Sequence, residues 1–108
     1  MIKKIESLIF IIGLFLISAC AAPVNVKSLD TVSNGSMVTL EGNIIEQLQG
    51  DDDLFLFKDS SGSIKVEIDD DAFPKEKIKP ETKVIISAEV EHLLNSVKLE
   101  VKRIEIAK

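Results

Sequence analysis

The 108-residue sequence predicts an all-β protein, a small five-stranded Greek-key barrel preceded by a signal peptide. The first observation is an N-terminal segment that is positive, then apolar, and ends in small residues before a cysteine. The second is a hydrophobic period of two from Ser36 onward, which is typical of half-buried strands. The third is the longest connection, which carries two prolines and separates the third predicted strand from the fourth.

The N-terminal segment has the three regions of a secretory signal peptide. Lys3 and Lys4 supply the positive charge, residues 7–19 contain no charge, and Ile17-Ser18-Ala19 directly precedes Cys20. This pattern resembles the signal of bacterial lipoproteins, and the resemblance implies cleavage before Cys20 and lipidation of its thiol. The alternative is an uncleaved anchor helix with Cys20 as a bystander. The uncharged run is, however, shorter than the roughly 20 apolar residues that span a bilayer.

We therefore expect a periplasmic protein that is anchored by lipid to the cell envelope. Several acyl chains anchor a protein stably, because each buried methylene contributes about 0.8 kcal/mol. By the sorting rule of Gram-negative lipoproteins, Ala21 in place of aspartate favours the outer membrane. Residues 1–19 are predicted to be the signal peptide, residues 20–34 a lipid-anchored tether with a short turn or helix around residues 28–32, and residues 35–108 the folded domain.

The mature chain is acidic. Removal of residues 1–19 leaves 11 basic and 17 acidic residues, a net charge of −6. Such a domain repels nucleic acid and anionic lipid at long range and attracts cations and basic peptides. Cys20 is the only cysteine, so no intrachain disulfide forms and the apolar core alone must hold the domain.

The first three predicted strands lie close together in the sequence. Apolar and polar positions alternate in residues 38–44, where Gly42 predicts a bulge or a tight bend. A turn at residues 49–53 leads to the apolar run of residues 54–57, and a hairpin connection joins that run to the alternating strand of residues 64–69.

The last two strands follow the longest connection, residues 72–82, which we expect to be a loop with at most a short helix. Residues 84–91 alternate, a loop covers residues 92–95, and the last strand begins at Val97. The apolar positions of that strand change parity near Lys102-Arg103, as a β-bulge would cause. Together these features predict an OB-fold, a Greek-key barrel of five strands. The alternative is a plain five-stranded sandwich or an open meander.

Several motifs also resemble those of one family, the bacterial OB-fold (BOF) family of YgiW/YdeI-type exported stress-tolerance proteins. Residues 38–44, VTLEGNI, are similar to the first strand of the family, and residues 56–62, LFKDSSG, to its hairpin. Residues 66–71, VEIDDD, resemble its acidic strand end, and residues 95–105 resemble its last strand. The motifs occur in the family's order over about residues 31–106.

The resemblance implies an OB-fold barrel, export, and a role in envelope stress tolerance without known catalysis. Two features depart from the family pattern. Family members often carry tryptophan where this chain has Phe73, two residues after the acidic triplet. Many members are soluble periplasmic proteins with an ordinary signal peptide, whereas Cys20 implies a tether.

The sequence offers little for catalysis, and we expect no enzyme activity and no cofactor. His92 is the only histidine and falls in a predicted loop, where a solvated residue is the simplest interpretation. No nucleophile motif or glycine-rich phosphate loop is present. The predicted strands place five glutamates outward in solvent, where we expect no acid–base chemistry. These are Glu41, Glu67, Glu89, Glu91 and Glu100.

Two acidic triplets are the candidate site. One lies in the predicted first loop, which borders the usual ligand face of an OB-fold, and the other ends the third strand. The candidate ligand-binding residues are Asp51, Asp52, Asp53, Glu67, Asp69, Asp70 and Asp71. Such a surface would attract a cationic peptide, a polyamine or a basic patch on an envelope protein. Consecutive aspartates lack the alternating spacing of a calcium loop, so a specific metal site is not predicted. The alternative is that both triplets are solvated turns that discourage edge pairing.

Nucleic acid is not an expected partner. OB-folds that bind single strands combine a basic groove with exposed aromatic side chains, whereas this chain is acidic and has no tryptophan or tyrosine. The competing function is an adaptor module that docks to another envelope protein through an edge strand or through the region of Phe55 and Phe57.

Overall fold

The computed structural model describes residues 22–107. The predicted signal peptide, its cleavage site and Cys20 lie outside these residues. The elements are β1 (Ala22–Pro23), η1 (Val26–Thr31), β2 (Met37–Gln47), β3 (Leu54–Asp59), β4 (Gly62–Ile68), η2 (Asp70–Ala72), β5 (Lys83–His92) and β6 (Val97–Ile106), where η denotes a 3-10 helix. Within residues 22–107 no helix is long and apolar enough to cross a membrane.

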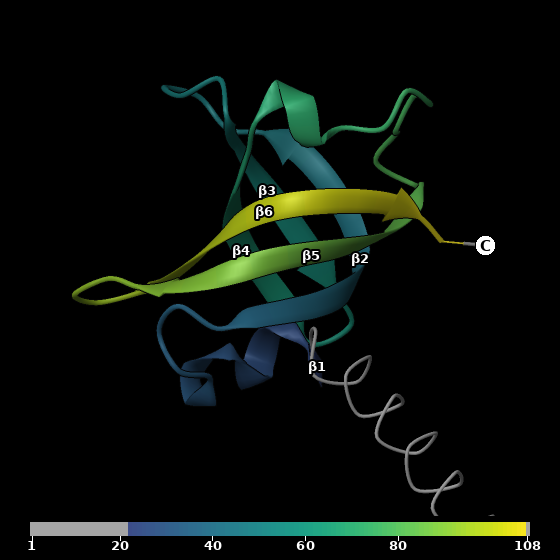
Figure 1. Ribbon diagram of the computed structural model, residues 1–108. Helices are drawn as coiled ribbons and strands as arrows, with labels where there is room; N and C mark the ends of the chain where they lie inside the picture. Colours follow the sequence, from purple (N-terminus) through teal and green to yellow (C-terminus); the bar gives the residue numbers. More distant parts are fainter. Residues whose placement is uncertain (1–21, 108) are drawn as a thin grey trace, which may run out of the picture.

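The five long strands close into a barrel, which confirms the predicted OB-fold (Figure 1). The sheet has the order β1-β2-β3-β4-β6-β5, and β5 returns to pair with β2. β6 lies between β4, its parallel partner, and β5, its antiparallel partner. This pairing excludes the open meander, because the closed sheet has a partner on each side of all five strands.

The bend that the sequence predicts in β2 lies at Gly42. Residues 37–43 of β2 pair with β5, and the pairing with β3 begins at Asn43. At this change of partner the two neighbouring strands approach closely, and a Cβ on Gly42 would lie 2.4 Å from the carbonyl oxygen of Lys58. Only glycine leaves room for that approach. The irregularity in the ladder itself lies further along, between Ile44 and Glu46.

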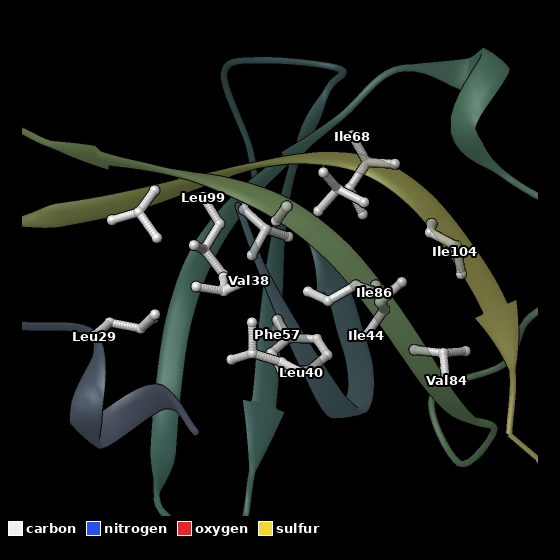
Figure 2. Packing of buried hydrophobic residues seen from close by; sticks show 14 residues of the cluster. Leu29, Val38, Leu40, Ile44, Phe57, Ile68, Val84, Ile86, Leu99 and Ile104 are labelled. Carbon is white, nitrogen blue, oxygen red and sulfur yellow. The ribbon is translucent and has the colours of Figure 1, made fainter. Parts of the chain in front are cut away.

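The core fills the barrel with the apolar side of each strand (Figure 2). Phe57 is its largest buried side chain, and all four apolar positions predicted for β5 are buried. The predicted bulge in β6 is confirmed, because Ser87 pairs with Arg103 whereas Ala88 pairs with Val101. The extra residue returns Ile104 to the inner side of the barrel. The barrel and its core are thus complete within residues 22–107.

The segment that we expected to serve as a tether, residues 20–34, is described from Ala22 on and packs against the barrel. β1 pairs in parallel with β2, and the short helix expected near residues 28–32 is present as η1. Asn25 caps η1 with a capping box, and Leu29 is buried in the core. Apolar residues in this segment give it a face to bury, so the chain follows the barrel from β1 onward.

The connection between β4 and β5 closes one end of the barrel. It begins with η2, which confirms the predicted short helix or loop at this place. The rings of Phe73 and Phe55 meet edge to face, with centroids 5.4 Å apart. Phe73, which stands where family members often carry tryptophan, therefore packs against Phe55 and shields the end of the core.

Candidate functional site

The loop between β2 and β3 holds the first acidic triplet in a hydrogen-bonded turn. Gly50 has a φ of 96°, a left-handed conformation that favours glycine. The backbone N–H of Asp53 donates to Oδ1 of Asp51 over 2.9 Å, and Gln47 Nε2 donates to the carbonyl oxygen of Asp52 over 2.6 Å. These bonds fix the course of the loop and direct a run of carboxylates toward solvent.

The structure brings the two triplets together. The N–H of Ile68, at the end of β4, donates to the carbonyl oxygen of Asp53 over 2.8 Å. One position earlier, Glu67 pairs with Leu54 across the β3–β4 ladder. Asp69 follows directly, so the second triplet begins beside the end of the first. We call this end of the barrel the acidic surface. It consists of Asp51, Asp52, Asp53, Glu67, Asp69, Asp70 and Asp71.

Asp53 lies at the centre of this surface. Partial desolvation raises the pKa of the Asp53 carboxyl, and the negative charges of the neighbouring acids raise it further. In order of effect, these neighbours are Asp69, Asp51, Asp70 and Glu67. Carboxylates from two loops and one strand therefore share one electrostatic field. Asp53 and Glu67 are half-buried, whereas the other five residues of the acidic surface are exposed.

Lys98 lies at the border of the acidic surface, and sequence reasoning did not place it there. Its Nζ is 3.8 Å from Glu67 Oε1 and 3.9 Å from Glu91 Oε1. Such solvated pairs contribute roughly 0–1 kcal/mol to stability. One cation therefore offsets little of the negative charge contributed by seven acids.

The acidic surface can attract positive charge at several points. Within residues 22–107, no three histidine, cysteine or acidic side chains converge as a metal site would require. Five aspartates of the acidic surface are exposed to water. The negative charge is therefore spread over the acidic surface rather than focused on one point.

His92 is the last residue of β5 rather than a loop residue as predicted. Its N–H donates to Oδ1 of Asn34 over 2.8 Å, and its ring Nε2 lies 2.6 Å from the carbonyl oxygen of Val32. The β5–β6 ladder extends to the pair of His92 with Val97, which the period-two pattern did not reveal. His92 thus joins the end of β5, next to the hairpin turn, to the segment before β2.

The predicted outward glutamates are split between two surroundings. Glu89 and Glu100 lie 3.9 and 3.3 Å from Lys102 Nζ, and Glu91 faces Lys98 as described. Glu41 instead borders a groove on the side of β2 near β1. These glutamates are therefore ion-pair or groove residues.

The predicted docking region at Phe55 and Phe57 is wrong. Both rings point into the barrel, where Phe57 is fully buried and Phe55 contacts Phe73. The reason is the register of β3, which turns Leu54 and Leu56 outward instead.

The most exposed large apolar side chains of the described residues lie at the tip of the β5–β6 hairpin, which projects from the barrel (Figure 1). Leu94 is 96% exposed there and Leu93 is 45% exposed. The tip is ordered by a turn in which the N–H of Leu93 donates to the carbonyl oxygen of Ser96. These two adjacent leucines form a small exposed apolar patch.

Comparison with known proteins matches residues 14–106 to the family described as bacterial OB fold (BOF) protein. The chain is 40% identical over 79 residues to protein YgiW of Escherichia coli strain K12, which covers 73% of this chain and 59% of YgiW. It is 35% identical over 83 residues to the calcium-regulated OB-fold protein CarO of Pseudomonas aeruginosa, which covers 77% of this chain and 70% of CarO. The matched region thus spans less than two thirds of the length of YgiW.

Solved structures agree on the fold. The structure of the hypothetical protein YgiW from Escherichia coli superimposes with a TM-score of 0.72 at 37% identity, covering 83% of this chain and 92% of that one. A replication protein A heterotrimer bound to single-stranded DNA superimposes with a TM-score of 0.65 at 13% identity, covering 82% and 81%. At that identity the likeness concerns the fold alone, and the DNA belongs to that protein.

Proposed function

The chain belongs to the bacterial OB fold (BOF) protein family, and on that basis we propose that it is a non-enzymatic binding protein of the cell envelope. In this proposal the acidic surface captures a cationic ligand, such as a cationic peptide or a polyamine, or a basic patch on an envelope protein. The link to stress tolerance comes from the resemblance to the family and is part of the proposal.

The observation that carries the proposal is the meeting of the two triplets. Separate triplets would each be an ordinary solvated turn, whereas here the loop before β3 is hydrogen-bonded to the end of β4. The raised pKa of Asp53, which desolvation and four neighbouring acids cause, is the signature of that crowding. A multivalent cation gains attraction from all these groups at once, and its affinity falls as salt rises.

The position of β1 supports an anchored orientation. We propose that Cys20 carries the lipid, and two residues span at most about 7 Å to Ala22, which already pairs with β2. The same end of the barrel holds the β3–β4 turn, because Val26 N–H donates to Asp59 Oδ2. The acidic surface lies at the other end of β3, roughly 20 Å away at the usual strand rise. In Figure 1, β1 and the connection after β4 lie at opposite ends of the barrel, so the proposed anchor would hold the acidic surface away from the membrane.

The relative CarO is named as calcium-regulated. A divalent cation belongs to the class of ligand that the acidic surface would attract, although we propose no coordinated ion. We infer instead that calcium competes with larger cationic ligands by associating with the carboxylates of the acidic surface without a fixed coordination site. Addition of calcium would then weaken peptide binding more strongly than sodium at equal ionic strength.

The test is a titration of residues 21–108, which include the complete barrel, with octalysine. Amide NMR spectra recorded at roughly 20 and 200 mM salt would locate the binding and its salt dependence. We expect shifts at the acidic surface that weaken at the higher salt concentration and that disappear in the Asp51→Asn/Asp53→Asn/Asp70→Asn variant. The matched control is Asp30→Asn, an exposed acid on η1 at the other end. Unchanged binding by the triple variant would refute the proposal.

An adaptor function is the second candidate, and the exposed Leu93-Leu94 tip favours it. A photo-crosslinking residue at position 94 of the full chain would join a docked envelope protein. The same residue at position 27, on η1, is the control. If this function holds, a Leu93→Ser/Leu94→Ser variant loses co-purification with the crosslinked protein and keeps octalysine binding. Equal crosslinking from both positions would rule out docking by the tip.

A further inference from the structure

A second surface lies near β1, distinct from the acidic surface. It is an open groove of about 1160 Å³ between the segment of residues 23–28, the floor of β2, the turn after β3 and the start of β5. Its charged lining residues are Glu41, Lys58, Asp59 and Lys83. The other lining side chains are small, polar or aliphatic, and none is aromatic.

Two lysines in this groove lie in one row across three strands. Asn43 of β2 pairs with Lys58 of β3 on one side and with Lys83 of β5 on the other. Neighbouring strands are about 4.8 Å apart, so the two lysine Cα atoms are roughly 10 Å apart with Asn43 between them. Directly paired residues project on the same side of a sheet, and both lysines are exposed. Their flexible stems allow both ammonium groups to reach one anion above Asn43.

The floor between the lysines is held in place. Asn43 Nδ2 donates to the carbonyl oxygens of Pro80 and Thr82, over 3.0 and 3.1 Å. These bonds tie β2 to the chain that leads into β5. The row is therefore fixed by two ladders and by this side chain.

The charges of the groove lack counterions in the described structure. Among residues 22–107, neither lysine of the row nor Glu41 has an ion-pair partner within 4.0 Å. Lys98, Lys102 and Arg103, on the outer side of β6, all face glutamates. Asp59 is already occupied by N–H groups of Val26 and the β3–β4 turn. The groove thus presents two unpaired cations and, two residues along β2 on the same face, one unpaired anion.

We propose that this groove binds the phosphoethanolamine headgroup of a zwitterionic phospholipid. The phosphate would lie between Lys58 and Lys83, and the primary ammonium would face Glu41. A free phosphate would leave Glu41 unpaired, and the groove has no aromatic side chain on which a nucleobase would stack. The choice of a lipid rests on the proposed anchor, because Pro23, Val24 and Asn25 form one wall of the groove directly after the point where the anchor would attach.

The test uses glycerophosphoethanolamine, the soluble form of this headgroup, and amide NMR spectra of residues 21–108. We expect shifts at Asn43, Lys58 and Lys83 but not at the acidic surface. The Lys58→Gln/Lys83→Gln variant should weaken binding at least tenfold, and Glu41→Gln should weaken glycerophosphoethanolamine while leaving glycerol phosphate unaffected. Lys102→Gln, which removes a lysine from the outer side of β6, is the control and should bind as the unchanged chain does.

Three outcomes would overturn the inference. The first is no shift in the groove at millimolar probe. The second is equal binding of glycerol phosphate and glycerophosphoethanolamine, which would indicate an anion site for free phosphate. The third is equal loss in the Lys102→Gln control. Because the probe is soluble, the result does not depend on lipidation of Cys20, and because octalysine binds elsewhere, failure here leaves the proposed function standing.

Discussion

Replacement of Gly42 by alanine tests the account of how the barrel closes. The new Cβ would lie 2.4 Å from the carbonyl oxygen of Lys58, 2.8 Å from the ring of Phe57 and 3.2 Å from Cβ of Asp59. The first obstacle is backbone within a paired strand and the second is the most central core ring, so neither can move aside at low cost. Both obstacles act at the point where β2 changes partners.

The expected loss of stability follows from two opposing effects. Overpacking of a filled core costs about 1–3 kcal/mol, and a backbone obstacle places this case at the upper end. Alanine recovers about 0.5–1 kcal/mol, because glycine is unfavourable within strands. The net loss is about 2–2.5 kcal/mol, which lowers the melting temperature of a domain of this size by on the order of 10–20 °C.

Urea unfolding of residues 21–108 followed by circular dichroism measures this loss. Gly62→Ala is the matched control, because its Cβ would meet only Val26 Cγ1 at an ordinary 3.5 Å. We expect that variant to stay within about 1 kcal/mol of the unchanged chain. A Gly42→Ala variant as stable as the Gly62→Ala variant would refute the reasoning.

Three further predictions concern single side chains. Asp59→Ala should cost about 2 kcal/mol, because a carboxylate with four hydrogen bonds is lost. Burial alone would raise the pKa of Asp59, but these bonds lower it. The stability that Asp59 contributes is therefore present above about pH 4 and is lost as the pH falls through the lowered pKa. The melting temperatures of the variant and of the unchanged chain, measured at about six pH values between about 2 and 7, should therefore converge in acid. A difference that stays constant with pH would contradict this role of Asp59. Asp53→Asn should raise the melting temperature at neutral pH, since the raised pKa of Asp53 reports an unfavourable charge, and the gain should vanish in acid and shrink in high salt. Leu29→Ala should cost about 2–5 kcal/mol in urea unfolding if residues 26–31 are part of the core, whereas a loose tether would show no loss.

The sequence was most informative where one side of a strand is buried. The alternating pattern correctly predicted the buried side of β5, because a shift by one residue would expose all four of its inward residues. These are Val84, Ile86, Ala88 and Val90. The bulge at Lys102 could be predicted for the same reason, since it changes which residues face inward. Local patterns of this kind therefore predicted the strands, the bend and the fold.

The candidate sites depend on pairing between distant segments, which such patterns do not contain. The contact of Asp53 with the end of β4 arises from the register of the β3–β4 ladder. The row of Lys58, Asn43 and Lys83 requires two ladders at once. The triplets themselves were visible in the sequence, but their meeting and the lysine row were not.

The burial of the N-terminal segment was missed for a different reason. Its polar composition and early proline favoured a tether, and its few apolar residues have no regular period. Leu29 finds its place only because the barrel offers an apolar surface there. Tertiary packing thus decided the conformation of a segment that is ambiguous on its own.

The position of β6 in the sheet has a consequence for the order in which the chain can fold. This last strand lies between β4 and β5 and pairs with both. The pairing with β5 continues to the N–H of Ala107, which donates to the carbonyl oxygen of Lys83. Until residues 97–107 have emerged, β4 and β5 each lack a neighbour, and every earlier form of the chain has two open edges. Pairing of segments so far apart is slow, in the range of milliseconds to seconds. The barrel of a chain that we propose to be exported would therefore close only after its final residues arrive.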